Sequence, residues 1–288
     1  MTPPDAHALS WTVMGVVLLG ALMHAAWNAI VKSRDDKLLD ITKVTTGAAV
    51  LGALALPGLP APAPASWPYL VASAAIHCAY FWLVAAAYRT GDLSLAYPVM
   101  RGSAPLLTAV LSYAVFAEKY NTIAWSGIAA LSIGIWLLAG EARRNLAHQG
   151  RSLTVGLGNA LVIVAYTLVD GAGVRLSDAP WSYVAWLFVL NALPLLFTLR
   201  VMRGPRFLAG PLLSWVQPFL GGALTLGSYG LALWAMTRAP VALVAALRES
   251  SVLFGLILAA VVLKERFGAM RWSASILVAC GAAALKLA

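Results

Sequence analysis

The chain has 288 residues, of which 61% are hydrophobic and only 11% are charged, and its formal net charge is +9. A soluble domain of this size would be nearer half apolar and a quarter charged, so the composition excludes an ordinary soluble globular protein. The basic residues stand in short stretches between apolar runs, which is typical of membrane orientation and argues against nucleic acid as a partner.

Ten apolar runs follow one another along the chain, and each approaches the roughly 20 residues that a helix needs to cross a bilayer. Tryptophan and tyrosine side chains stand near the ends of several runs, where interfacial anchors are expected. The runs are 9–31, 41–58, 68–88, 95–116, 122–140, 153–174, 181–200, 216–237, 240–263 and 269–287. The sequence therefore predicts a multi-pass α-helical membrane protein.

Lysine and arginine are distributed unevenly between the two sets of loops that ten spans create. One set carries fourteen of these residues and the opposite set carries four. Because the more basic loops remain in the cytoplasm, we expect both termini outside and the 141–152 linker inside. This orientation depends on the even number of spans, and the expected location is the plasma membrane, as a bacterial inner membrane.

The two halves of the chain resemble each other at a constant offset of 147 residues. The shared residues include arginine, glutamate and tryptophan, which two unrelated apolar segments would rarely share in one register. The matched pairs are Arg101 with Arg248, Ser103 with Ser250, Glu118 with Glu265, Trp125 with Trp272, and Gly134 with Gly281.

Each half contains five predicted spans, an odd number, so the second half must enter the membrane in the opposite direction to the first. The predicted fold is therefore an all-α membrane protein with ten transmembrane helices. They form two inverted five-helix repeats, residues 1–140 and 153–288, around a central cavity. Inverted repeats of this kind are common in secondary transporters, which bind their substrate between the halves.

Several segments, taken in order, resemble the EamA-type transporters of the drug/metabolite transporter superfamily. They are ALMHAAWNAIVK, AYRTGDLSLAYPVMRGSAPLLTAVLSYAVFAEK and WSGIAALSIGIWLLAG, and the second half repeats the pattern as LRESSVLFGLILAAVVLKERF and WSASILVACGAAALKLA. The resemblance covers essentially the whole chain and implies a ten-helix inverted-repeat fold with a central cavity. It also implies export or exchange of small metabolites, often amino acids or their analogues, without fixing a substrate.

Arg101 lies about six residues into the fourth predicted span, and Tyr97 precedes it by one turn on the same face. Charged side chains inside a bilayer are costly and usually face the interior of a bundle or a wet cavity. Pro98 and Pro105 permit a kink on either side of the arginine. Because guanidinium binds carboxylate or phosphonate at two points, Arg101 and Tyr97 are candidate substrate-binding residues. The alternative is an arginine that extends to the membrane surface.

Arg248 and Glu249 lie about eight residues into the ninth predicted span. Neighbouring helix positions point about 100° apart, so one of these side chains can bind substrate while the other pairs with an adjacent helix. An internal ion pair with a purely structural role is the alternative.

The first predicted span carries His24 and Asn28 one turn apart, on one face. Histidine ordinarily titrates near neutral pH, which makes His24 a candidate for proton coupling. Asn28 is a candidate for substrate binding. Hydrogen bonding between helices is the alternative for the histidine.

Four further candidates for substrate binding come from the third and sixth predicted spans. Tyr166 and Asp170 form another pair one turn apart, and Tyr80 and Trp82 offer aromatic faces. Core packing is the alternative for the aromatic residues. We expect His77 to be a core residue and Glu118 to be a structural group at a helix end.

The sequence contains no phosphate-binding glycine loop, zinc-binding helix motif or Gly-x-Ser-x-Gly segment. We therefore expect no enzymatic activity, metal or cofactor, and energy from an ion or substrate gradient. The predicted function is secondary transport of a small anionic or zwitterionic metabolite, such as an amino acid, with proton coupling through His24. The alternative is a broad-specificity exporter of hydrophobic compounds.

The expected partners are the substrate and the lipid bilayer, and the chain is expected to be a monomer or a homodimer.

Overall fold

The computed structural model describes residues 9–32, 36–90, 93–138, 149–209, 211–262, 264 and 268–288. Within these ranges the chain is helical and contains no β-strand. The α-helices are α1 (Trp11–Lys32), α2 (Lys37–Ala55), α3 (Trp67–Thr90), α4 (Leu93–Phe116), α5 (Thr122–Leu138), α6 (Gln149–Leu176), α7 (Pro180–Arg203), α8 (Val216–Met236), α9 (Val241–Arg248), α10 (Ser251–Val262) and α11 (Ala269–Leu287). Short 3-10 helices occupy Leu56–Gly58, Pro64–Ser66 and Leu212–Trp215.

Eight segments of the described chain are long and apolar enough to cross a membrane. They lie in α1, α2, α4, α6, α7, α8, the α9–α10 segment and α11, while α5 is apolar but shorter. These segments confirm the prediction of an all-helical, multi-pass membrane protein. Helix α3 coincides with the third predicted run but is not among the eight segments, so the count of ten spans stays a prediction.

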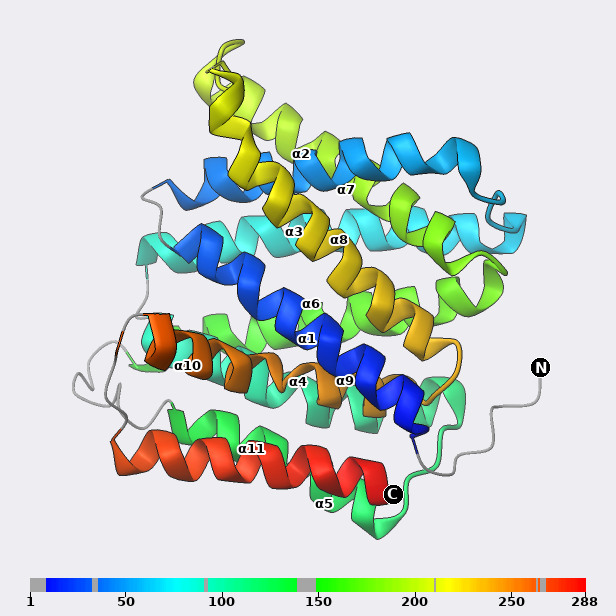
Figure 1. Ribbon diagram of the computed structural model, residues 1–288, viewed down its shortest axis with the longest axis vertical. Helices are drawn as coiled ribbons and strands as arrows, with labels where there is room; N and C mark the ends of the chain where they lie inside the picture. The colour runs from blue at the N-terminus through cyan, green and yellow to red at the C-terminus, as the bar shows by residue number, and fades with distance from the viewer. Residues whose placement is uncertain are drawn as a thin grey trace.

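The helices lie side by side and connect distant parts of the sequence (Figure 1). Helix α11 packs along α5 at one edge of the molecule, and α2 packs on α7 and α8 near the other. Between them, α1 packs on α8, and α6 packs on both α3 and α4. The start of α1 and the end of α11 meet, because Lys286 Nζ lies 4.7 Å from the ring centroid of Trp11.

Two helix pairs approach so closely that only glycine fits at the contact. A Cβ atom on Gly281 of α11 would lie 2.7 Å from the carbonyl oxygen of Gly127 on α5. A Cβ atom on Gly222 of α8 would lie 2.5 Å from the backbone nitrogen of Ala48 on α2. Lipid tails are as apolar as side chains, so membrane helices associate through this kind of close packing.

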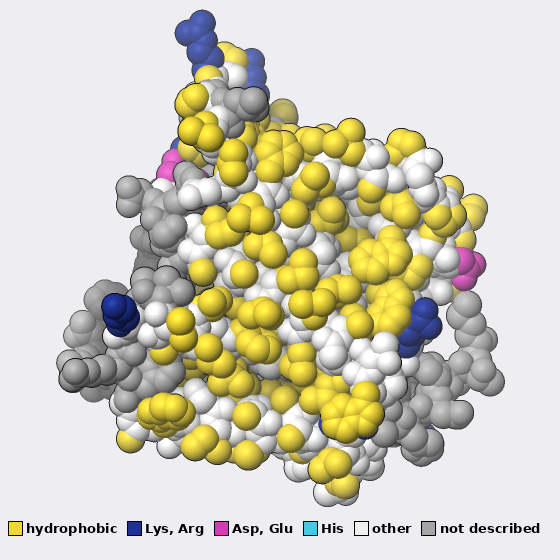
Figure 2. Space-filling model, viewed as in Figure 1, with side chains coloured by type: hydrophobic (Ala, Val, Ile, Leu, Met, Phe, Trp, Pro, Cys, Tyr) yellow, Lys and Arg dark blue, Asp and Glu magenta, His cyan; other side chains and the backbone are white. Residues whose placement is uncertain are grey.

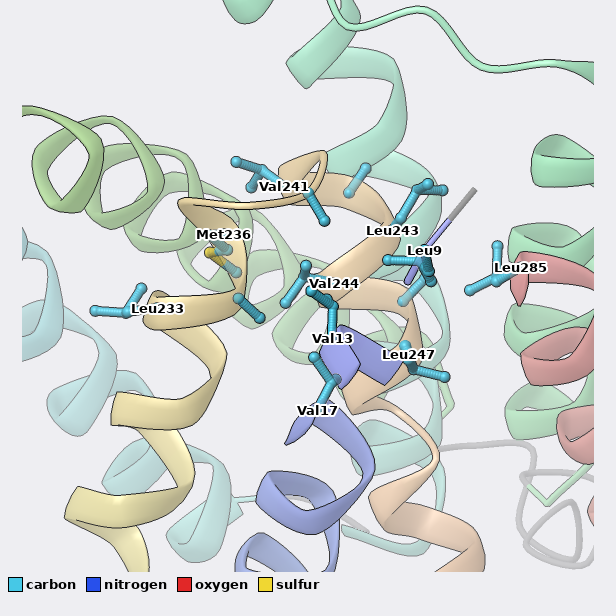
Figure 3. Close-up of a cluster of buried hydrophobic side chains, with 14 of the residues drawn as sticks. Leu9, Val13, Val17, Leu233, Met236, Val241, Leu243, Val244, Leu247 and Leu285 are labelled. Atoms are coloured by element: carbon cyan, nitrogen blue, oxygen red, sulfur yellow. The ribbon is translucent and has the colours of Figure 1, made fainter. Parts of the chain in front are cut away.

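The ninth predicted span, 240–263, is interrupted near its middle. Helix α9 ends at Arg248, a turn at Glu249 and Ser250 follows, and α10 begins at Ser251. Most of α9 is buried, and Figure 3 shows its leucine and valine side chains against those of α1 and α8. By contrast, every described side chain from Val252 to Val261 of α10 is at least partly exposed. The break therefore separates a densely packed segment from a loosely packed one.

The surface is suited to lipid. Hydrophobic side chains are spread over the face shown in Figure 2, whereas lysine and arginine lie at its edges. Leu54, Phe197, Val201 and Val261 are among the apolar side chains that are more than two-thirds exposed. Such a surface would aggregate in water, and a bilayer provides the solvent that it needs.

Candidate functional site

A buried ion pair joins α4 to the break between α9 and α10. Arg101 Nε lies 2.8 Å from Glu249 Oε2, and Arg101 Nη2 donates to Ser251 Oγ at 2.9 Å. Arg101 is 8% exposed and Glu249 is 5% exposed. Two charges removed from water in this way must compensate each other, so the pair holds α4 against the break.

The backbone at the break differs from an α-helix in its hydrogen bonds. The amides of Glu249 and Ser250 donate to carbonyl oxygens three residues earlier, at 3.0 and 3.1 Å. Ser250 Oγ also donates to the carbonyl oxygen of Leu247 at 2.6 Å. Irregular backbone at membrane depth is tolerated where protein packs around it or where it lines a wet cavity. Interrupted helices of this kind form the binding sites of many transporters.

Arg248 is placed differently from Arg101, its counterpart in the first half. Its guanidinium carbon lies 5.0 Å from the centre of the Tyr229 ring, a cation–π contact. Among the described residues, no carboxylate forms an ion pair with Arg248. The position equivalent to Glu249 in the first half is Gly102, where an added Cβ would lie 2.4 Å from the Trp136 side chain. Among the described residues, the guanidinium of Arg248 is therefore held by an aromatic ring and by no ion pair.

Asp170 is fully buried and lies at the centre of a second polar cluster. Tyr183 donates to Asp170 Oδ1 at 3.1 Å, and Tyr229 donates to Asp170 Oδ2 at 2.5 Å. The Tyr229 side chain thus contacts Asp170 through its hydroxyl and Arg248 through its ring. The two polar clusters share this residue.

His77 belongs to the same cluster, although the sequence led us to expect a plain core residue. Its ring stacks on Tyr166 with the centroids 4.4 Å apart, and its Nδ1 lies 2.9 Å from the carbonyl oxygen of Ser73. Asp170 lies within electrostatic reach of His77. The sequence contains one hint that His77 belongs to a polar cluster. Ser73 lies one turn before it, so the serine and the histidine share one face of the helix.

Tyrosine rings extend from this cluster toward the ion pair. Tyr166 packs edge-on against Tyr80 at 6.0 Å and against Tyr229 at 6.4 Å between centroids. Tyr80, Tyr97 and Tyr166 all lie within electrostatic reach of Arg101. Tyr97 is 42% exposed. The structure thus gathers most of the candidate residues in one region.

The candidates of the first span lie at the margin of this region. His24 is within reach of the charges of Arg101 and Arg248, and its Nδ1 accepts a hydrogen bond from Trp27 Nε1 at 3.3 Å. Asn28 donates to the carbonyl oxygen of His24 at 2.8 Å, a bond within its own helix. Trp82 belongs to α3, and its side chain lies outside the described part of the structure.

A separate network joins the ends of α4 and α6. Glu118 pairs with Arg175 at 2.8 Å and accepts hydrogen bonds from Tyr120 at 2.5 Å and from the amide of Val241 at 2.9 Å. Arg175 also donates to the carbonyl oxygen of Met236 at 2.8 Å. These contacts fix the connection between α8 and α9. Glu265, the counterpart of Glu118, lies outside the described residues.

Comparison with known proteins gives three results. Residues 151–286 match the EamA-like transporter family. The chain is similar to a Bacillus subtilis (strain 168) protein named uncharacterized transporter YwfM, with 24% identity over 180 residues that make up 61% of this chain and 58% of that protein. The match thus spans less than two thirds of the length of that relative.

The third result concerns the fold alone. A solved crystal structure of a protein superposes with a TM-score of 0.72 and 18% sequence identity, and the match covers 96% of each chain. The family match and the relative confirm the resemblance noted in the sequence. Together, the match to the EamA-like transporter family over residues 151–286 and the relative named a transporter support an EamA-type protein of the drug/metabolite transporter superfamily.

Proposed function

We propose that the protein is a secondary transporter that carries a small zwitterionic or anionic metabolite, such as an amino acid or an analogue, across the plasma membrane. The observation that carries the proposal is the Arg101–Glu249 pair beside Arg248, at a helix break inside a membrane-spanning segment. Ionisable groups at membrane depth are rare and mark the paths of substrates and ions. Family membership and the name of the B. subtilis relative support transport in general.

The proposed binding mode uses the difference between the two arginines. Arg248 has no acidic partner among the described residues, so its guanidinium is available for the carboxylate or phosphonate of a substrate. Glu249 would receive the ammonium group of a zwitterion in competition with Arg101, which it contacts at 2.8 Å. Tyr80 and Tyr166 would contact the rest of the molecule through their rings.

The packing of α5 on α11 supports two inverted five-helix repeats, residues 1–140 and 153–288. Gly127 faces the carbonyl oxygen of Gly281, and Gly134 faces that of Ala274. At the offset of 147 residues, Gly127 corresponds to Ala274 and Gly134 corresponds to Gly281. Exchanging the halves therefore turns one contact into the other, which is the signature of a two-fold interface.

The exposure of α9 and α10 supports an access route to the site. Side chains before the break are buried, whereas those from Val252 to Val261 are at least partly exposed. We infer that the site opens along α10. Because α10 runs toward loops rich in lysine and arginine, this side is the cytoplasm under the predicted orientation with both termini outside.

The experiment that tests the proposal is uptake into liposomes that contain the purified protein. The panel comprises labelled amino acids, labelled phosphonates and several unrelated hydrophobic dyes, and protein-free liposomes serve as the control. Saturable uptake of one class of charged metabolite supports the proposal. Comparable uptake of all hydrophobic dyes, without saturation by any amino acid or phosphonate, contradicts it and favours the alternative of a broad-specificity exporter.

A further inference from the structure

We propose that Asp170, enclosed by Tyr183, Tyr229 and His77, is a proton-binding site that drives transport and is separate from the substrate-binding residues. This inference rests on the proposed function. It assigns coupling to Asp170, in place of the His24 expected from the sequence, and removes Asp170 from the substrate site.

The surroundings of Asp170 favour a proton over a substrate amine or a metal cation. Asp170 has no exposed surface, and each of its carboxylate oxygens accepts a hydrogen bond from a tyrosine hydroxyl. A substrate ammonium would have to displace Tyr183 or Tyr229 to reach it. A metal cation would need the lone pairs of several oxygens, and these hydroxyls direct hydrogens at the carboxylate instead. A proton needs no such space.

Polar groups from α3, α7, α8 and its own helix surround Asp170, and a charged group of α9 lies beyond them. A buried carboxylate is costly without such partners, and protonation removes the charge that causes the cost. The groups are Ser73 and His77 of α3, Tyr166 of its own helix α6, Tyr183 of α7, Tyr229 of α8 and, behind the Tyr229 ring, Arg248 of α9.

His77 and Tyr166 supply a connection between Asp170 and the region of the ion pair. The His77 ring stacks on the partly exposed Tyr166, which lies within electrostatic reach of Arg101. Histidine carries protons readily near neutral pH. His24 is a poorer carrier in this setting, because a protonated His24 would be a third positive charge beside Arg101 and Arg248.

Tyr229 provides the coupling between proton and substrate. Its hydroxyl donates to Asp170 at 2.5 Å, and its ring lies beneath Arg248 at 5.0 Å. A substrate carboxylate that binds Arg248 would draw it away from the Tyr229 ring. The surroundings of Tyr229 would then change, and Tyr229 is also the residue that donates a hydrogen bond to Asp170. If one binding event alters the affinity of the other, the effect must be equal in both directions.

The binding step is a simple protonation. The carboxylate of Asp170 takes up one proton from one side of the membrane, becomes a neutral carboxylic acid, and later releases the proton to the other side. No bond within the substrate changes.

Infrared titration of the purified protein in lipid, without substrate, tests the site directly. We expect a carboxylic-acid C=O stretch that grows as the pH is lowered, is lost in Asp170→Asn, and persists in Glu249→Gln and His24→Gln. Tyr183→Phe keeps the carboxyl but removes one hydrogen bond, so the band should change frequency. Absence of a titrating band, or its loss in Glu249→Gln with persistence in Asp170→Asn, would overturn the assignment.

A flux measurement tests the coupling, with a mixture of labelled amino acids as the probe. An imposed pH gradient should raise uptake by the wild type several-fold, whereas the ratio in Asp170→Asn should be about one. Stimulation by a sodium gradient instead, or loss of all Asp170→Asn uptake even without a gradient, would contradict a separate proton site. If the wild type takes up no probe while the infrared band still titrates, the proposed function fails independently of the proton site.

Discussion

Single residues distinguish the two halves of the chain at the site. Arg101 and Arg248 are equivalent by sequence, yet only the second half has an acid after its arginine, and Glu249 pairs with Arg101 across the halves. In the first half, Gly102 makes room for Trp136. Two arginines and one acid at the helix break leave a positive excess, which suits a substrate with a negative group.

Removing either member of the Arg101–Glu249 pair leaves the other as a buried, uncompensated charge. We expect Glu249→Gln to lower the free energy of unfolding by about 3 kcal/mol. The double variant Arg101→Gln/Glu249→Gln should lose less than the sum of the single variants, because neither charge is then left alone. Denaturant unfolding in mixed micelles measures both, and strictly additive losses would contradict a direct pair.

Asp36 and Arg203 form a third ion pair, outside the membrane-spanning interior. The hydrogen bonds from Arg203 hold the pKa of Asp36 below its ordinary value, and the amide of Leu39 adds to the effect. A lowered folded-state pKa stabilises the protein above the ordinary carboxyl pKa of about 3.9. That contribution disappears as the pH falls through the lowered value.

Asp36→Asn should therefore cost no more than about 1 kcal/mol at neutral pH, because the pair is partly exposed and screened by solvent. The difference from the wild type should vanish in acid below the pKa of Asp36. Thermal unfolding across a pH series measures this, with the exposed Asp178→Asn as the matched control. A deficit that persists unchanged in strong acid would show that the ion pair is not its cause.

Individual helices reveal what the sequence can and cannot specify. Arg101, Glu249 and Asp170 were recognisable because charge inside an apolar run is costly and conspicuous. The break at Glu249 and Ser250 was not, since the run 240–263 contains no proline after Pro240 and the interruption coincides with a contact from α4. His77 was missed because Tyr166 and Asp170, which link it to the site, belong to another helix, and Ser73 of its own helix was the only nearby signal.

The contact between α2 and α8 predicts a sharp effect of a small substitution. A Cβ atom at Gly222 would lie 2.5 Å from the backbone nitrogen of Ala48 and 2.8 Å from the carbonyl carbon of Gly47, so the helices must separate. We expect Gly222→Ala to lower the free energy of unfolding by about 1–3 kcal/mol. Gly15→Ala, where no atom lies within 4 Å, is the control and should be neutral or slightly stabilising. Equal effects of the two variants would contradict the close approach.

The exposure of α10 predicts different reactivity on the two sides of the break. In a background without Cys78 and Cys280, Gly255→Cys should react with a membrane-impermeant maleimide at least tenfold faster than Ala246→Cys. Nothing lies within 4 Å of a Cβ atom at Gly255, whereas Ala246 is fully buried. Equal rates in liposomes would contradict access along α10.

At the scale of the whole molecule, the start of α1 and the end of α11 lie on one side. Lys286 of α11 lies over Trp11 of α1, and Asn121 donates to the terminal carbonyl oxygen of Ala288 at 2.8 Å. This agrees with an even number of membrane crossings. The sequence could predict the all-helical membrane class from composition alone, but the count of ten spans depends on α3, which is not among the eight segments, and on α5, which is shorter than they are.

Epitope tags test the predicted orientation. Tags at both termini should be accessible to antibody in intact cells, whereas a tag within the 141–152 linker should become accessible only after permeabilisation. Accessibility of one terminus and protection of the other would show an odd number of crossings and would contradict the inverted repeat.

The central claim is that the arginines at the helix break bind a negatively charged group of the substrate. The most direct measurement is the initial rate of uptake of labelled amino acids and phosphonates by liposomes containing Arg101→Gln or Arg248→Gln, compared with the wild type and matched for folded protein. We expect Arg248→Gln to reduce uptake at least tenfold and Arg101→Gln to reduce it strongly as well. Undiminished, saturable uptake by both folded variants would contradict the account.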